Sequence, residues 1–386
     1  MESLSKYKKV RRAYGLDEIA LVPNKTTIDV ADVDISVKIA GLELKVPIIG
    51  SAMDGVIDTG TAILMSQYGG LGILNLHGVQ TRYENPELIL EKIASGSNTE
   101  YVELMQKIYQ EPIKEELIAK RIKDIKSHGA YAVVSSIPQD AERFGKIAEK
   151  AGADAFLVQS TVVSVEHFST HYGALDLSKL VKELKIPVMV GNCTAYDTTL
   201  SLMKTGVAAI FIGVGPGAAC TSRGVLGIGV PMATAVADAA DARIDYFRDT
   251  NRYVPIIADG GIATGGDICK AIACGADAVM IGSPLAKSKE APGRGFHWGM
   301  ATPNATLPRG TRIKVGTIGS LESIIHGPAV YDDGTQNFSG ALKTSMGTLG
   351  ARNLKEMQDI EVIVAPSLLT EGKVYQKAQQ LGMYHK

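Results

Sequence analysis

A glycine-rich stretch that carries a cysteine is the most chemically distinctive part of the sequence. It reads GVGPGAACTSRG over residues 213–224 and has Cys220 near its end. Glycines let a backbone bring its N–H and C=O groups against a ligand or an ion. The thiol is either a small buried side chain, as most free cysteines are, or a nucleophile that a nearby cation and amide dipoles keep ionised. The neighbours Thr221, Ser222 and Arg223 favour the nucleophile.

Two further motifs place small polar residues directly after apolar runs. Asp259-Gly260-Gly261 follows the apolar run at 254–258, and Gly282-Ser283 follows AVMI at 278–281. Such motifs are either helix caps and tight turns or a phosphate site built from backbone N–H groups. Both follow late strands, where barrel enzymes commonly hold phosphate, so phosphate binding is the better interpretation. Because a phosphate would repel Asp259, we expect this carboxylate to accept from ribose hydroxyls instead.

A third motif, Ser51-Ala52-Met53-Asp54, follows the first apolar run of this kind. It either forms a wall of the same pocket or caps the following helix. The other cysteines, Cys193, Cys269 and Cys274, have neither metal-ligand spacing nor the density of a disulfide scaffold. We therefore expect them to be structural thiols.

Repeated units indicate which elements position these motifs. Continuous apolar strands are expected near residues 47, 71, 131, 155, 187, 209, 255 and 278, several of them after a glycine that ends a helical stretch. Continuous rather than alternating apolar strands are typical of a parallel sheet covered on both faces. Eight β/α units, without a GxGxxG motif after the first strand, favour an α/β TIM (β/α)8 barrel over a Rossmann sheet.

The rest of the chain is expected to elaborate one barrel domain over residues 1–386. The segment at about 79–129 is helical and charged, and we expect a surface elaboration there. Residues 287–337 are rich in Gly, Pro and Thr, which predicts a long active-site flap over the carboxyl end of the barrel. Residues 337–358 are expected to form a helix pair.

Composition limits the class of partner. The chain has 40 Lys and Arg against 41 Asp and Glu, and its net charge of -1 predicts neither nucleic acid nor an anionic membrane as partner. No apolar run approaches the ~20 residues that a spanning helix needs, and the first residues lack the apolar stretch of a secretory signal. We expect a cytoplasmic protein that acts on a small molecule.

The sequence resembles the IMP dehydrogenase and GMP reductase family over nearly its whole length. The matching segments, in the family's order, are GSAMD (50–54), GVGPGAACTSR (213–223), IIADGGI (256–262), VMIGSPLA (279–286), EAPG (290–293) and GM (299–300). The resemblance implies a barrel that holds a purine nucleoside monophosphate. It also implies that Cys220 attacks purine C2 and that a hydride then passes to NAD.

The resemblance also implies roles for individual residues. Ser222 would help with positioning or proton transfer; it stands where the family usually has threonine. Contacts with the nucleotide are implied for Ser51, Met53, Asp259, Gly260, Gly261, Gly282, Ser283 and Met300. Ser160, Asn192 and Gly213 would lie beside the nicotinamide, and the carbonyls of Gly215, Gly217 and Cys220 would bind a monovalent cation such as K+. Family barrels form tetramers or octamers, so a homo-oligomer is expected.

Several positions depart from the family's pattern. The paired CBS domains inserted after the second strand are absent from the sequence, and the helical stretch near 79–129 takes their place. Ala218 replaces a serine that donates to phosphate. Gln159 replaces an aspartate that meets the cofactor ribose, Phe211 replaces an arginine, and His297-Trp298 replaces a Tyr-Arg pair beside the nucleotide.

Residues of the flap distinguish IMP dehydrogenases from GMP reductases in this family. The glutamate that reductases place after Gly-Met is missing, because residues 301–304 are Ala-Thr-Pro-Asn. Arg309 stands where dehydrogenases activate water, although its partner tyrosine is missing, and Arg312 is a second candidate. Either arginine could instead be a solvated side chain or a phosphate clamp. We favour Arg309 as the base because Pro308 stiffens its approach, and we expect an IMP dehydrogenase. The alternatives are an NADPH-dependent GMP reductase and a purine-nucleotide-binding protein without catalysis.

Overall fold

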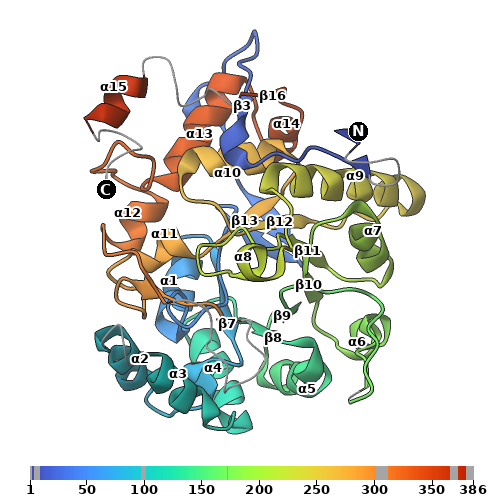
Figure 1. Cartoon of the computed structure of the whole chain (residues 1–386), viewed down its shortest axis with the longest axis vertical. Coiled ribbons are helices and arrows are strands. Elements are labelled where there is room, and N and C mark those ends of the chain that lie inside the picture. Colours follow the sequence, from blue (N-terminus) through green and yellow to red (C-terminus); the bar gives the residue numbers. More distant parts are fainter. Residues whose placement is uncertain are drawn as a thin grey trace.

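The computed structural model describes residues 2–3, 9–96, 101–171, 173–300, 312–365 and 373–379. Its centre is a closed parallel barrel in which neighbouring strands follow the chain order and β13 pairs with β6 to complete the ring (Figure 1). The strands of the barrel are β6 (Ile48–Gly50), β7 (Leu71–Asn75), β8 (Val133–Ser136), β9 (Ala155–Gln159), β10 (Val188–Cys193), β11 (Ala209–Ile212), β12 (Ile256–Asp259) and β13 (Ala278–Ile281). These eight strands confirm the predicted TIM barrel.

The strands are apolar throughout because each has one face inside the barrel and one under the helices. In β11, Phe211 belongs to the cluster that fills the barrel, whereas Ile210 and Ile212 belong to the cluster shared with the outer helices. All three side chains are fully buried. A strand buried on both faces has no polar positions, which is why the pattern is continuous rather than alternating.

Helices follow the strands in turn around the outside. They are α1 (Thr59–Gln67), α4 (Glu115–Ser127), α5 (Ala141–Ala151), α6 (Leu177–Glu183), α7 (Tyr196–Lys204), α9 (Met232–Thr250) and α10 (Gly265–Ala273). Gly152 and Gly206 follow α5 and α7 with φ of +91° and +93°, a left-handed conformation that glycine adopts without steric cost. These two glycines confirm the predicted helix ends.

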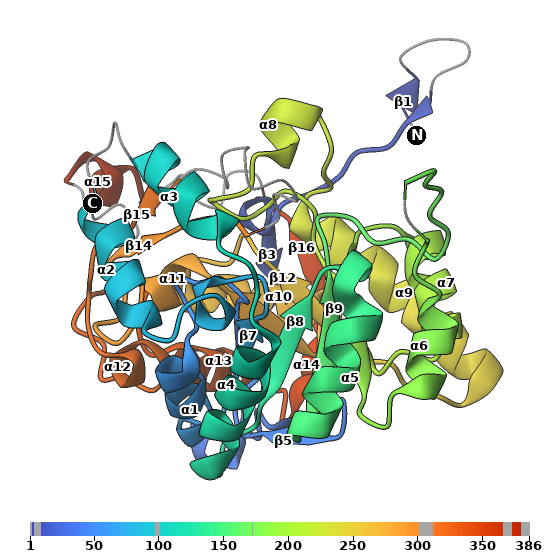
Figure 2. The ribbon, with the colours of Figure 1, turned by 90° about the horizontal axis from the view of Figure 1, so that it is seen from below.

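A hairpin closes the amino end of the barrel. Strands β4 (Val37–Ile39) and β5 (Leu42–Leu44) pair antiparallel, and Ile39, Leu42 and Leu44 join the interior cluster. Figure 2 shows β5 at one end of the barrel and α8 (Ser222–Leu226) at the other. The carboxyl ends of the strands, and the loops that follow them, therefore lie on the α8 side.

The segment at 79–129 is more than a surface elaboration, because one of its helices is an outer helix of the barrel. It contains η3 (Val79–Thr81), α2 (Pro86–Ser95), α3 (Tyr101–Gln110) and α4. Helix α4 packs between α1 and α5 and buries Leu117, Ile118 and Ile122. Most charged residues of this helix lie on its outer face, whereas Arg121 is buried and donates to the Gln80 carbonyl, so composition alone indicated a surface feature.

The chain after β13 returns to α2 and α3. It forms α11 (Ser283–Ala286), the antiparallel pair β14 (Phe296–His297) and β15 (Ile313–Lys314), and α12 (Leu321–Ile325). Trp298 is fully buried in a cluster with Met105 and Tyr109 of α3. Residues 301–311, which include Arg309, lie outside the described residues.

The predicted helix pair near the C-terminus is present as α13 (Phe338–Leu349) and α14 (Leu354–Gln358). The remaining elements are β1 (Glu2–Ser3), β2 (Lys9–Val10), β3 (Ile19–Leu21), β16 (Val362–Val364), α15 (Lys373–Ala378), η1 (Leu16–Glu18), η2 (Val30–Asp32) and η4 (Pro138–Asp140). Among the described helices, none combines the length and the apolar character that crossing a membrane requires.

Candidate active site

Closure of the barrel brings the motif after β6 next to the motif after β13. Ser51 N–H donates to the Ile281 carbonyl with an N to O distance of 3.0 Å. A methyl group added at Gly282 would lie 3.3 Å from Met53 Sδ and 3.5 Å from Ser51 Oγ. Gly282 and Ser283 are only partly buried. The predicted nucleotide residues Ser51, Met53, Gly282 and Ser283 are therefore side by side at the open end of the barrel.

Asp259 is the centre of a hydrogen-bond network that joins the ends of β9, β10 and β12. Its Oδ2 accepts from Asn192 Nδ2 at 2.7 Å and from Gln159 Nε2 at 3.0 Å. Gln159 Nε2 also donates to Asn192 Oδ1 at 3.0 Å. Burial raises the pKa of Asp259 to about 6, although the bonds from Asn192 and Gln159 favour the ionised form and act against this rise.

The glycine-rich loop lies directly against the loop that follows β12. Gly213 has φ of +147°, and a methyl group added there would lie 2.2 Å from the Asp259 carbonyl oxygen. A methyl group at Gly261 would lie 2.9 Å from Pro216 Cβ. A side chain at either position would force the two loops apart, so these glycines permit the contact. The contact joins the loop that bears Cys220 to Asp259-Gly260-Gly261.

Cys220 differs from the other cysteines in its exposure. It is exposed at the surface, whereas Cys193 and Cys269 are buried and Cys274 is partly buried. Burial raises the pKa of each of those three thiols to about 11, which keeps them protonated at neutral pH. Of the described cysteines, Cys220 is therefore the accessible thiol on the carboxyl side of the barrel.

The groups around Cys220 come from its own loop. Cys220 Sγ donates to Ser222 Oγ at 3.4 Å, and Ser222 is 7% exposed at the start of α8. The Cys220 N–H donates to the Gly217 carbonyl at 3.0 Å. The Arg223 guanidinium donates to the Val230 carbonyl at 2.8 Å and closes the loop. Ser222 is thus the polar side chain that contacts the thiol.

The residues expected beside a nicotinamide are linked to one another. Ser160 N–H donates to the Gly191 carbonyl at 2.9 Å, and Asn192 N–H donates to the Ser160 carbonyl at 3.0 Å. Asn192 Nδ2 also donates to the Gly213 carbonyl at 2.9 Å. Ser160, Asn192 and Gly213 therefore form one wall, and the same Asn192 amide connects it to Asp259.

A second polar network lies below the motif after β6. Tyr109 OH donates to Asp54 Oδ2 at 2.5 Å, and Trp298 Nε1 donates to the Tyr109 hydroxyl at 2.8 Å. Tyr109 also contacts Met300 Sδ at 3.6 Å. Tyr109 comes from α3, and no motif in the sequence predicts a role for it. The network places Met300 at the junction between the nucleotide residues and the chain after β13.

His297 lies under Ser283. Its Nε2 is 2.8 Å from Ser283 Oγ, and the residue is 2% exposed. Burial lowers the pKa of His297 to about 4, so the imidazole is neutral at pH 7. In the sequence, His297 stands out only as a departure from the family's pattern.

Of the two flap arginines, the structure describes Arg312. Arg312 is 9% exposed, and its guanidinium donates to the carbonyls of Ile93 at 2.6 Å and Gly96 at 2.9 Å. It also lies over the rings of Tyr101 and Phe296. Arg312 therefore holds α2 and α3 to the chain after β13 and is not available as a base. Arg309, the preferred candidate, lies outside the described residues.

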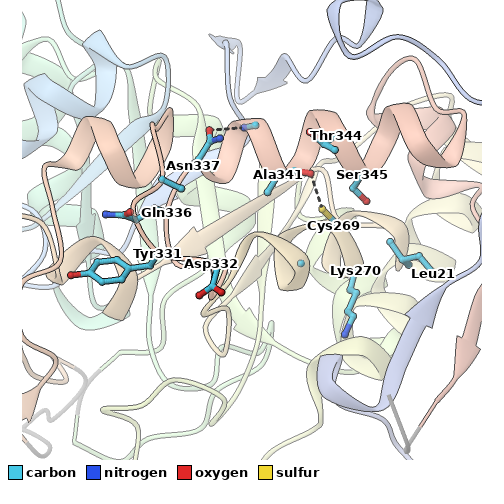
Figure 3. A pocket seen from close by; sticks show the side chains of 14 residues that line it. Leu21, Cys269, Lys270, Tyr331, Asp332, Gln336, Asn337, Ala341, Thr344 and Ser345 are labelled. Carbon is cyan, nitrogen blue, oxygen red and sulfur yellow. Dashed lines mark hydrogen bonds between the residues drawn. The ribbon is translucent and has the colours of Figure 1, made fainter. Parts of the chain in front are cut away.

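A cavity of about 590 Å³ lies away from these residues, between α10 and α13 (Figure 3). None of the predicted site residues lines it. Two of its polar side chains have partners within the protein: Asn337 caps α13 through Gly340 N–H, and Lys270 Nζ donates to the Leu16 carbonyl at 2.8 Å. We therefore locate the candidate site at the barrel mouth.

Comparisons with known proteins identify the family of this chain. Residues 13–374 match the IMP dehydrogenase / GMP reductase domain, so the match contains every predicted site residue. The chain belongs to the IMP dehydrogenase / GMP reductase family. A solved member, an IMP dehydrogenase/GMP reductase-like protein of Corynebacterium glutamicum, superposes with a TM-score of 0.88 at 36% identity, covering 94% of this chain and 97% of that one.

The names of two similar proteins differ in how specific they are. An uncharacterized oxidoreductase of Mycobacterium leprae is 37% identical over 92% of this chain and 97% of its own length. The inosine-5'-monophosphate dehydrogenase of Methanocaldococcus jannaschii is 28% identical over 94% of this chain and 95% of its own. The protein is thus an oxidoreductase of this family.

The raised pKa of Asp259 predicts how the free energy of unfolding depends on pH. Between about pH 4 and 6 the folded protein holds a proton that the unfolded chain releases, so the ionised carboxylate costs stability above pH 6. We expect Asp259→Asn to raise the free energy of unfolding at pH 8 by up to about 3 kcal/mol, and to have almost no effect near pH 4. Urea denaturation at the two pH values measures this.

The control for this prediction is Asp241→Asn, at an exposed position of α9. It should leave the free energy of unfolding unchanged at both pH values. An Asp259→Asn protein that is no more stable than the wild type at pH 8 would show that the buried carboxylate carries no electrostatic cost.

Proposed function

We propose that the protein is a purine-nucleotide oxidoreductase that acts at purine C2 through Cys220, and that it oxidises IMP to XMP with NAD. The observation that supports this most directly is the exposed Cys220 thiol. It contacts a buried Ser222 hydroxyl in a loop that lies against Asp259-Gly260-Gly261. A nucleophile beside a nucleotide pocket is the arrangement that covalent catalysis at a purine carbon requires.

The nucleotide would lie across the loops after β6, β12 and β13. Ser51, Gly282 and Ser283 offer hydroxyl and backbone groups to the phosphate, and Asp259 accepts from the ribose hydroxyls. Asp259 serves as such an acceptor when it is ionised, which its pKa of about 6 allows at neutral pH. Gln159 and Asn192 hold the carboxylate by one oxygen and leave the other for the ribose.

The reaction proceeds in two stages. Cys220 loses its proton, and its sulfur adds to C2 of IMP. NAD held beside Ser160, Asn192 and Gly213 would accept the hydride that leaves C2. The oxidised nucleotide would then remain attached to Cys220 as a thioimidate. Water then adds to C2, and breakage of the C–S bond returns the thiol and releases XMP. Ser222 is positioned to orient the thiol before the attack and to relay the thiol's proton by passing its own hydroxyl proton on to solvent.

The residues present fit both of the implied small groups. Ser160 is partly buried, and no described group bonds its hydroxyl, so it offers a hydrogen bond beside the Asn192 and Gly213 wall. For K+, the carbonyls of Gly215, Gly217 and Cys220 would be the ligands. The Gly217 carbonyl accepts from Cys220 N–H, and its second lone pair remains for a cation.

Arg309 is our candidate for the group that activates water. Arg312 cannot serve, because it donates to Ile93 and Gly96 and is enclosed by aromatic rings. An arginine becomes a base only where its surroundings disfavour the charged form, since its pKa normally exceeds 12. Closure of the flap over the nucleotide would provide such surroundings.

GMP reduction is the second candidate. The hydrogen bonds that hold Arg312 favour GMP reduction. They leave Arg309 as the remaining arginine for the hydrolytic stage, and Arg309 has no tyrosine partner in the sequence pattern. A reductase would add hydride from NADPH to the Cys220 adduct of GMP after ammonia leaves, and would need no activated water. Against it, residues 301–304 hold no glutamate to assist ammonia loss.

The deciding experiment measures reduced-nicotinamide absorbance in potassium buffer. We expect absorbance to rise with IMP and NAD, and to stay constant with GMP and NADPH. A fall with GMP and NADPH, and no rise with IMP, would reverse the direction of the reaction. No change with either pair would favour a nucleotide-binding protein without catalysis.

Cys220→Ala tests the nucleophile. The variant should lose at least about three orders of magnitude in kcat, because no other exposed thiol lies at the site. Its affinity for the nucleotide, measured by calorimetry, should be nearly that of the wild type. Cys274→Ala is the matched control and should keep full turnover. Substantial turnover by Cys220→Ala would exclude the covalent mechanism.

Arg309→Ala tests the hydrolytic stage. We expect one rapid burst of NADH per active site, followed by very slow turnover, because hydride transfer precedes hydrolysis. Stopped-flow absorbance at the NADH band measures both phases. Arg294→Ala, which alters an exposed arginine paired with Glu91, should leave both phases unchanged. Loss of the burst itself would assign Arg309 to binding rather than to water activation.

A further inference from the structure

We propose that His297 positions the Ser283 hydroxyl for the nucleotide phosphate and takes up a proton when that phosphate binds. The inference rests on the proposed function, since it concerns the phosphate end of the same nucleotide. It adds a protonation step to nucleotide binding and gives a role to His297.

The geometry places His297 directly behind Ser283. Ser283 is partly buried at the barrel mouth, whereas His297 is 2% exposed beneath it, with Nε2 at 2.8 Å from Ser283 Oγ. The β14 backbone is pressed against Gly55, where a methyl group would lie 2.9 Å from His297 Cα. The imidazole is therefore held in place by its backbone as well as by Ser283.

The second ring nitrogen has no partner. His297 Nδ1 is buried, and among the described residues nothing hydrogen-bonds to it. A buried polar atom without a partner costs free energy, so it is rare unless a ligand or a water completes it. Of the two orientations of the Nε2–Oγ bond, donation by Nε2–H turns the Ser283 O–H outward toward a ligand. Nδ1 then carries the lone pair that can take a proton.

The electrostatics favour protonation of His297 when the nucleotide phosphate binds. Burial alone lowers the pKa of His297 to about 4, so the ring is neutral at pH 7 without ligand. The charged residues on the neighbouring segments are Asp54 and Asp58 before α1, Lys287, Lys289, Glu290 and Arg294 between α11 and β14, and Lys314 on β15. A phosphate that accepts from Ser283 would lie two hydrogen bonds from the ring, and its negative charge raises the pKa of His297.

Calorimetry of IMP binding in two buffers of different ionisation enthalpy tests the proton uptake. The comparison is between the wild type and His297→Gln, because glutamine can donate to Ser283 but cannot take up a proton. The titration of the nucleotide's own phosphate contributes equally to both proteins. Between pH 5.5 and 6.5 we expect the wild type to take up about half a proton more than the variant, and the difference to disappear at pH 8.

Phosphate-free inosine tests the positioning role. Ser283→Ala and His297→Phe should each weaken IMP binding about tenfold or more at pH 6, and should leave inosine binding unchanged. His297→Gln should retain most of the affinity for IMP at pH 8. This rescue distinguishes a positioning residue from one that merely fills space.

Three results would overturn the inference. If IMP binds but proton uptake is equal in the wild type and His297→Gln, the protonation step is wrong and the proposed function stands. If His297→Phe and Ser283→Ala weaken IMP and inosine equally, the pair does not act on the phosphate. If neither IMP nor GMP binds the wild type, the proposed function fails and this inference fails with it.

Discussion

The pairing of β13 with β6 is the constraint on which the candidate site depends. It aligns Ile281 with Gly50 and so places the residues after Ile281 beside those after Gly50, although more than two hundred positions separate them in the chain. The other parallel pairings set the remaining loops around the same rim. A parallel barrel brings all its strand ends to one face, and this face collects the polar residues that each loop contributes separately.

Within that face, one partly buried carboxylate couples the two halves of the proposed chemistry. Asp259 is held by Gln159 and Asn192, and Asn192 also bonds the Gly213 carbonyl at the start of the cysteine loop. The ribose acceptor, the nicotinamide wall and the nucleophile loop therefore share one network. A group with a raised pKa at such a position costs stability when ionised, and function is the common reason that such a cost persists.

The chain after β13 connects this face to the helices that depart most from the family's pattern. Trp298 and Met300 contact Tyr109 of α3, and Arg312 bonds the end of α2. In place of the paired CBS domains, α2 and α3 support the described part of the chain that follows β13. His297-Trp298, which replaces the family's Tyr-Arg pair, makes two contacts. The tryptophan packs against α3, and the histidine contacts Ser283.

The sequence by itself determined the barrel, its strands and the loops that hold the polar motifs, because strand burial and helix ends are local and leave continuous apolar runs and left-handed glycines. Tertiary structure alone decided the partners of the polar side chains. Gln159 meets Asp259 across 100 positions and Trp298 meets Tyr109 across 189, so no local spacing could indicate either contact. It also decided that α4 belongs to the barrel wall and that Arg312 is structural, since both depend on which surfaces the closed barrel presents to them.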